Sequence, residues 1–228
     1  MPEGIITISY LISGILFILS LGGLSNQETS RRGNVYGIVG MGIAIVATLV
    51  GQQVSGLGWL IMLMLPAGAL GIFVAKRVQM TSMPELVAIL HSFVGAAAVL
   101  VGVVSYQDSG KFSGSALIIH EVEIIIGVIV GAVTFTGSLI AFGKLKGMIS
   151  SKPLSLPLRH QTNLLMLIAC VVFGGMMLIG EPSGEMNALI WIIIISSVLG
   201  MHMIMAIGGA DMPVVVSMLN SYSGWAAA

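Results

Sequence analysis

Long apolar runs alternate with short polar connections along the whole chain. Eight runs can be distinguished, and they lie at about residues 5–24, 35–51, 57–75, 84–104, 116–142, 164–180, 187–207 and 213–228. Each is near the roughly 20 residues that a helix needs to cross the hydrocarbon core of a bilayer. The pattern predicts an all-α fold, a polytopic bundle of about eight transmembrane helices that forms one domain over residues 1–228.

The composition favours a membrane protein over a soluble one. Of the 228 residues, 57% are apolar and 8% are charged, whereas a soluble domain carries about 25% charged residues. The 30 glycines suit helices that approach closely within a bilayer, and Gly127-x-x-x-Gly131 in the fifth run is such a close-packing signal. The formal net charge of zero gives no indication of a nucleic-acid partner.

The two ends of the chain bear on its domain organisation. The first run lacks the basic start of a signal peptide, since its only early charge is Glu3, so we expect it to remain in the mature protein. The last run is still apolar at Ala228, so we expect the final helix to be truncated and the natural polypeptide to continue.

The basic residues are distributed unevenly over the connections. Eight of the nine Lys and Arg residues lie in the connections after the first, third and fifth runs, and the opposite connections hold only Lys111. Because Lys and Arg favour cytoplasmic loops, the N-terminus is predicted to lie outside. The fourth and eighth helices then both begin on the cytoplasmic side, at Pro84 and Pro213.

These two helices begin with related sequences. Met83–Ala98 is matched in register by Met212–Ala227, with Asn220 in the place of His91. Each of the two polar residues follows its proline by about 10 Å of helix, so both should lie at a similar depth. Small residues surround both at helical spacing, which is typical of a helix–helix face. We therefore expect both side chains to point into the bundle and to line one shared path.

His91 is the strongest candidate for chemistry. An ionisable residue inside a membrane helix is costly and suggests a function, and histidine titrates near neutral pH, which suits reversible protonation. The alternative is a structural histidine bonded to a neighbouring carbonyl group. Asn220 cannot titrate, but its amide both donates and accepts hydrogen bonds; it is either a neighbour in a proton path or a polar clamp between helices.

Carboxylates near the helix ends allow two interpretations each. Glu85 lies in the first turn of its helix, where it either complements the helix dipole or serves in proton access. Asp211 follows Gly208–Ala210, which suits a mobile coupling loop, although Asp211 is equally suited to cap the next helix. The cluster His120–Glu123 is more typical of a solvated rim than of a site. The chain has no nucleotide-binding glycine loop, no metal-ligand spacing and no nucleophile–base set.

Three long stretches resemble the beta subunit of proton-translocating NAD(P) transhydrogenase. They are Pro84–Gly95, Gly131–Ser138 and Gly208–Trp225, and the shorter Glu28–Arg31 and Ser150–Leu154 agree as well. The resemblance implies an enzyme of the bacterial cytoplasmic membrane that moves hydride between NADH and NADP⁺ while protons cross the bilayer. It also implies that NAD(H) binds to a partner alpha subunit, that NADP(H) binds to a domain following the membrane helices, and that protomers form a homodimer. One further helix and the NADP(H) domain are absent here, so this chain alone is expected to bind no cofactor or metal and to be inactive.

The resemblance also implies roles for single residues. His91 falls on the family's proton-channel histidine and Asn220 on its channel asparagine, while Asp211 falls on the acidic residue of the loop facing the NADP(H) domain. Glu123 matches another acidic position of the family. We therefore predict a proton carrier at His91, a polar neighbour at Asn220 and a coupling loop at Asp211, with Glu85 and Glu123 as further candidates.

Two other functions stay open. A proton-coupled secondary transporter without redox chemistry would show similar repeats and polar sites, although the short repeat here is not inverted, because both copies begin on the same side. A nucleotide-binding domain downstream of Ala228 would favour the transhydrogenase, and an early stop codon would favour the transporter. A structural scaffold with one buried histidine predicts that substitution of His91 changes stability but not proton movement.

Overall fold

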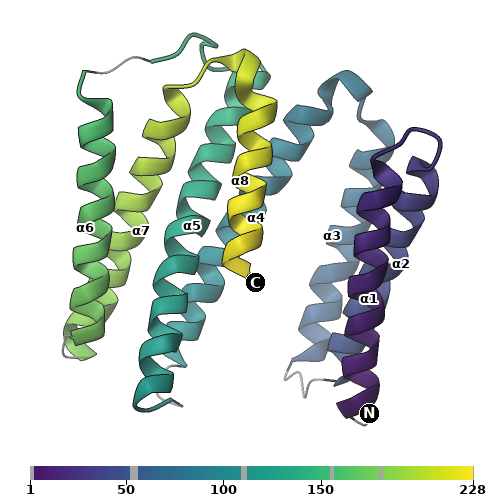
Figure 1. The fold of residues 1–228 in the computed structure, drawn as a ribbon, viewed down its shortest axis with the longest axis horizontal. Helices are drawn as coiled ribbons and strands as arrows, with labels where there is room; N and C mark the ends of the chain where they lie inside the picture. The colour runs from purple at the N-terminus through teal and green to yellow at the C-terminus, as the bar shows by residue number, and fades with distance from the viewer. Residues whose placement is uncertain (1–2, 52–55, 109–111, 155–156, 180–181, 228) are drawn as a thin grey trace. The chain divides into compact units, whose positions relative to one another are not determined.

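The computed structural model describes the chain apart from residues 1–2, 52–55, 109–111, 155–156, 180–181 and 228. The described residues form an all-α structure, as predicted (Figure 1). Its α-helices are α1 (Glu3–Leu24), α2 (Ser30–Gly51), α3 (Leu57–Arg77), α4 (Met83–Gln107), α5 (Ser115–Leu145), α6 (Arg159–Ile179), α7 (Pro182–Met205) and α8 (Met212–Ala227). Short 3₁₀ turns, η1 (Met80–Ser82) and η3 (Gly209–Asp211), precede α4 and α8. Lys111 and Ala228, which entered the predictions of orientation and truncation, lie outside the described residues.

The predicted membrane bundle is confirmed. Seven of the described helices are long and apolar enough to cross a bilayer. The eighth, α8, has 16 described residues, which is shorter than the roughly 20 residues of a spanning helix. The chain is a multi-pass membrane protein.

The chain divides into two compact units, Met1–Arg77 and Val78–Ala228. In the first unit α1 and α2 pack as an antiparallel pair (Figure 1). Small residues make this contact close: a Cβ atom at Gly33 would lie 2.8 Å from the carbonyl oxygen of Ser20. The Ser13 hydroxyl donates to the carbonyl of Gly40 at 2.7 Å, so a polar bond also joins the two helices.

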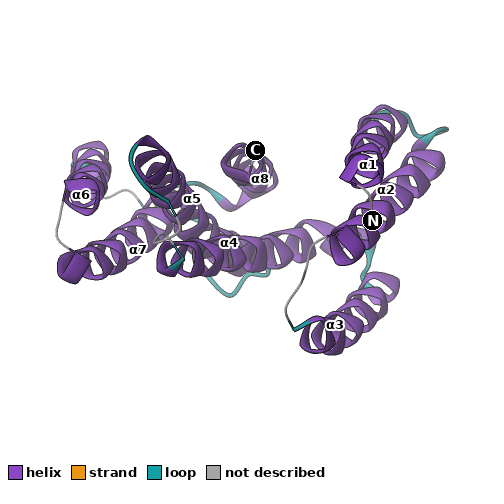
Figure 2. Cartoon of the chain, turned by 90° about the horizontal axis from the view of Figure 1, so that it is seen from below, coloured by secondary structure: helices purple, strands orange, loops and turns teal. Residues whose placement is uncertain are grey.

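The central helix of the second unit is α5, which lies beside α4, α7 and α8 in both views of the fold (Figures 1 and 2). Glycines permit two of these contacts. A Cβ atom at Gly95 of α4 would lie 2.7 Å from the carbonyl oxygen of Gly131, and one at Gly200 of α7 would lie 2.6 Å from that of Val133. Backbones that come this close gain van der Waals contact, which is the main attraction between helices in a bilayer.

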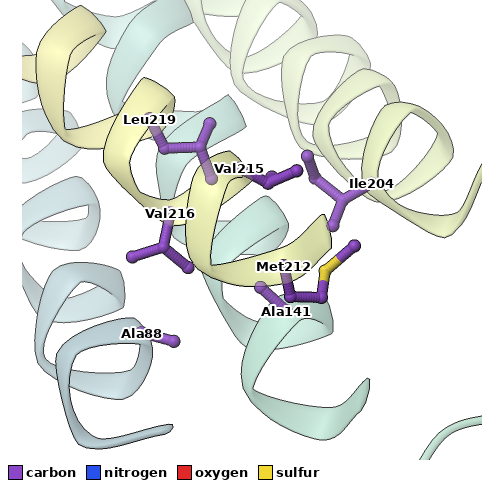
Figure 3. Packing of buried hydrophobic residues seen from close by; sticks show 7 residues of the cluster. All are labelled: Ala88, Ala141, Ile204, Met212, Val215, Val216 and Leu219. Carbon is purple, nitrogen blue, oxygen red and sulfur yellow. The ribbon is translucent and has the colours of Figure 1, made fainter. Parts of the chain in front are cut away.

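One hydrophobic cluster joins the first turns of α4 and α8 to the last turns of α5 and α7 (Figure 3). It consists of Ala88, Ala141, Ile204, Met212, Val215, Val216 and Leu219. The cluster places the beginnings of α4 and α8 at the same end of the unit, as the sequence predicted. A second cluster lies towards the opposite end and consists of Ile124, Ile125, Val128, Met177, Ala188, Leu189 and Ile192.

Candidate functional site

His91 is buried on the face of α4 that packs against α5. Its side chain is 6% exposed, and Ala88 and Gly95, one turn away on either side, are buried with it. The Nε2 atom lies 3.4 Å from the Ser223 hydroxyl of α8, which is at the long end of the range for a hydrogen bond. The structure therefore brings the two related helices together at His91, as predicted, but through Ser223.

Asn220 does not point into the packed interior, contrary to the prediction. Its side chain is exposed in this chain, and its backbone carbonyl accepts a hydrogen bond of 3.0 Å from the Ser223 hydroxyl. The buried face of α8 carries Val216 and Leu219, and Ser223 follows one turn later. At about 100° per residue, Asn220 lies at the edge of this face, one turn after Val216 but about 100° from Leu219, on the side that this chain leaves uncovered.

Two hydroxyl groups are fully buried on α5. Thr134 and Ser138 are both 0% exposed, and neither hydroxyl has a hydrogen-bond partner among the described residues. A buried polar group without a partner costs about 1–3 kcal/mol. The described side chains therefore give these hydroxyls no partner, which makes them candidates for a hydrogen bond to water.

Ser138 lies at the level of His91 in the antiparallel pair of α4 and α5. Gly95 of α4 lies against Phe135 of α5, and Ala88 shares its hydrophobic cluster with Ala141. His91 falls between Ala88 and Gly95, and Ser138 falls between Phe135 and Ala141. Ser138 belongs to a stretch that carried the family resemblance, but its residue type alone gave no reason to select it.

An open cavity of about 520 Å³ lies between α4, α5 and α8. Small and apolar residues form most of its lining, and its polar residues are Ser105, His120, Glu123 and Ser223. From Val94 to Ser105 the cavity follows α4 for about 16 Å. It thus extends from the hydroxyl that contacts His91 to the first turns of α5.

The cluster at the beginning of α5 is less solvated than expected. Glu121 is buried, with 7% exposure, so the interpretation of the whole cluster as a solvated rim is wrong. The His120 ring lies 4.4 Å from that of Phe112, and its Nε2 atom is 3.4 Å from the Ser105 carbonyl oxygen. Glu123 is exposed and lines the cavity.

Glu85 and Asp211 lie at the other end of the unit. Glu85 is half-buried in the first turn of α4, and the hydrogen bond of His91 among the described residues is to Ser223, not to Glu85. Asp211 is exposed on η3, immediately before α8. Among the described residues its carboxylate makes no hydrogen bond to the start of α8, so the capping interpretation gains no support. The accessible position of Asp211 suits contact with another domain.

Comparison with known proteins gives the family. Residues 6–228 match the family described as NAD(P) transhydrogenase beta subunit. The chain belongs to this family. Two NAD(P) transhydrogenase beta subunits from Rhodospirillum rubrum, one of them from a named strain, are each 45% identical over 232 residues. The matches cover 100% of this chain and 49% of each relative, so this beta-subunit chain spans about half the length of the curated relatives it matches.

The buried polar side chains of this beta-subunit chain are of types that can take part in proton transfer. Histidine, serine and threonine side chains can pass a proton because each both donates and accepts hydrogen bonds. Across the described ranges no group of three His, Cys, Asp or Glu residues is arranged to hold a metal ion. The buried polar groups around His91 thus form the candidate site, and Ser223, Thr134 and Ser138 join the residues that the sequence indicated.

Proposed function

We propose that this chain is the proton-conducting membrane module of a NAD(P) transhydrogenase. In the complete enzyme of the bacterial cytoplasmic membrane, hydride transfer between NADH and NADP⁺ is coupled to proton movement through the bilayer. NAD(H) binds to an alpha subunit, NADP(H) binds to a domain of the same full-length beta subunit, and protomers associate as a homodimer. Membership of the beta-subunit family supports this function. The single observation that carries the role of this chain is the burial of His91 beside the Ser223 hydroxyl.

The proton path follows the cavity between α4, α5 and α8. Glu123 and His120 line one end of the cavity, and Ser223 lies at the other, in contact with His91. Water in the cavity connects the two ends, and His91 takes up the proton. The unpartnered hydroxyls of Thr134 and Ser138 offer further hydrogen-bonding positions on the α5 side.

Asn220 keeps a role at the border of this module. Its amide lies on the exposed face of an apolar helix, and an uncovered amide in hydrocarbon costs several kilocalories per mole. The face is therefore covered by protein in the complete enzyme. Asn220 then binds a polar group from that part of the assembly, beside the path through Ser223.

Coupling requires that the nucleotide state changes the access of protons to His91. A ligand shifts such an equilibrium only if its affinity differs between the two conformations. Asp211 lies on the exposed turn before α8, and Ser223 lies about 18 Å further along the same helix. A displacement of this turn by the NADP(H) domain is thus carried by α8 to the contact between Ser223 and His91.

The proposal is tested with vesicles that contain the full-length beta subunit and its alpha subunit. We expect proton uptake to begin when NADPH and an NAD⁺ analogue are both present and to stop when either is left out. A proton-coupled transporter would move protons with its solute gradient, whatever the nucleotides. Proton movement that ignores nucleotides would contradict the proposal.

A further inference from the structure

Lys144 is a buried lysine at the end of α5. Its side chain is 2% exposed, and its ammonium group donates to the carbonyl oxygens of Met205 at 2.7 Å and Ile207 at 2.6 Å. Lysine is almost never fully buried unless it is paired. Met205 is the last residue of α7 and Ile207 follows two residues later, so both carbonyls lie at the negative end of the helix dipole, which favours a cation.

Two backbone hydrogen bonds join the same region. The amide of Leu154 donates to Met205 at 3.0 Å, and the amide of Gly209 donates to Ser151 at 2.9 Å. We call this region the α5–α7 junction; it consists of Lys144, Ser151, Leu154, Met205, Ile207 and Gly209. The junction ties the end of α7 and the turn before α8 to the end of α5.

We propose that Lys144 is a positioning residue that makes proton access at His91 depend on the nucleotide state. The inference rests on the proposed function. The junction lies directly before α8, the helix that carries Ser223 to His91. The remaining contact between α8 and α5 is largely hydrophobic, and such contact is not directional. Lys144 supplies directed, charge-assisted hydrogen bonds, which hold the segment before α8 in place against the end of α5.

Loss of these bonds separates the motion of the turn from that of α8. A displacement at Asp211 would then loosen the end of α7 and would no longer change the contact between Ser223 and His91. Hydride transfer would continue, because the nucleotides bind elsewhere, but fewer protons would accompany each hydride.

The test measures protons taken up per hydride transferred, in vesicles that contain the complete enzyme. Lys144→Met keeps the length of the side chain and removes its charge. We expect the ratio to fall at least about fivefold, which is the lower end of usual coupling between sites. Lys144→Arg keeps the charge and should restore most of the ratio. The control is Lys146→Met, because Lys146 is exposed and lies 5.3 Å from the Phe142 ring centroid, and it should leave the ratio unchanged.

A merely structural lysine would give a different result. Misfolding lowers proton uptake and hydride transfer together. The number of protons taken up per hydride by the molecules that do fold then stays at the wild-type value. That result for Lys144→Met overturns the proposal.

If Lys144→Met does not assemble, Gly209→Ala decides, because its Cβ atom would lie 2.7 Å from the Cβ of Ser151 and disturb the same junction with Lys144 intact. A wild-type ratio in Gly209→Ala overturns the proposal, and a lowered ratio supports it. Wild-type enzyme without nucleotide-dependent uptake would refute the proposed function itself.

Discussion

Ser223 is the side chain through which α8 reaches the buried histidine. Ser223→Ala removes the hydroxyl that lies 3.4 Å from the Nε2 atom of His91. We expect nucleotide-driven proton uptake to slow roughly fivefold, which corresponds to the loss of one net hydrogen bond of about 1 kcal/mol. Ser221→Ala serves as the control, because Ser221 is exposed on the same helix. Equal slowing in both variants would remove Ser223 from the path.

Substitution of Ser138 tests whether its buried hydroxyl serves proton movement or packing. The hydroxyl is buried without a partner among the described residues, so Ser138→Ala relieves an unfavourable polar group. We expect the melting temperature of the purified complex to stay the same or rise, while proton uptake slows. A lower melting temperature with normal uptake would show that the hydroxyl serves packing.

Between elements, glycine determines how closely α4 approaches α5. A Cβ atom at Gly95 would lie 2.7 Å from the Gly131 carbonyl oxygen, whereas one at Gly127 would meet no described atom within 4 Å. Gly95→Ala should therefore destabilise the complex by about 1–3 kcal/mol, as overpacking does. Gly127→Ala should be nearly neutral. Thermal unfolding of the purified complex measures both, and equal stability of the two variants would contradict the close contact.

The helices were predictable, but their orientation about their own axes was less so. Apolar runs and the two prolines gave the number of helices and the common direction of α4 and α8. The small residues around Asn220 predicted that its side of α8 packs against another helix. This prediction was wrong because α8 is apolar or small on most of its surface. In a bilayer both the lipid-facing side and the packed side of a helix are apolar, so sequence pattern distinguishes them poorly.

Lys144 shows why the end of a helix can be misjudged. The apolar run that predicted the fifth helix ends near residue 142, and Lys144 was counted among the basic residues of the following connection. The helix continues to Leu145, and this extension turns Lys144 into the protein, towards the end of α7. Only the fold brings the carbonyls of Met205 and Ile207 to this position.

At the scale of the whole molecule, Asp211 is the residue that the proposed function places in contact with another domain. It is exposed on the turn before α8. Asp211→Asn keeps the shape of the side chain and removes its charge, so we expect the release rate of NADP(H) to change more than the affinity for NAD(H). Stopped-flow release measurements on the complete enzyme would check this. Unchanged NADP(H) release would exclude Asp211 from coupling.

The roles of Glu85, Glu123 and Asn220 stay predictions at this scale. The chain spans about half the length of its curated relatives, and Asn220 is exposed on α8, as is Trp225 on another side of the same helix, with 81% exposure. Under the proposed function, such exposed side chains take their partners from parts of the assembly outside this chain. Sequence and fold together therefore define the buried residues around His91 more fully than the residues at the edge of the proposed path.

The most direct test is proton uptake by vesicles that hold the complete enzyme, driven by hydride transfer from NADPH to an NAD⁺ analogue. Wild type and His91→Ala are compared at equal protein content. If His91 carries the proton, the variant stays folded, binds both nucleotides and loses uptake. If the variant takes up protons at the wild-type ratio to hydride, His91 is a packing residue, and the path does not run through it.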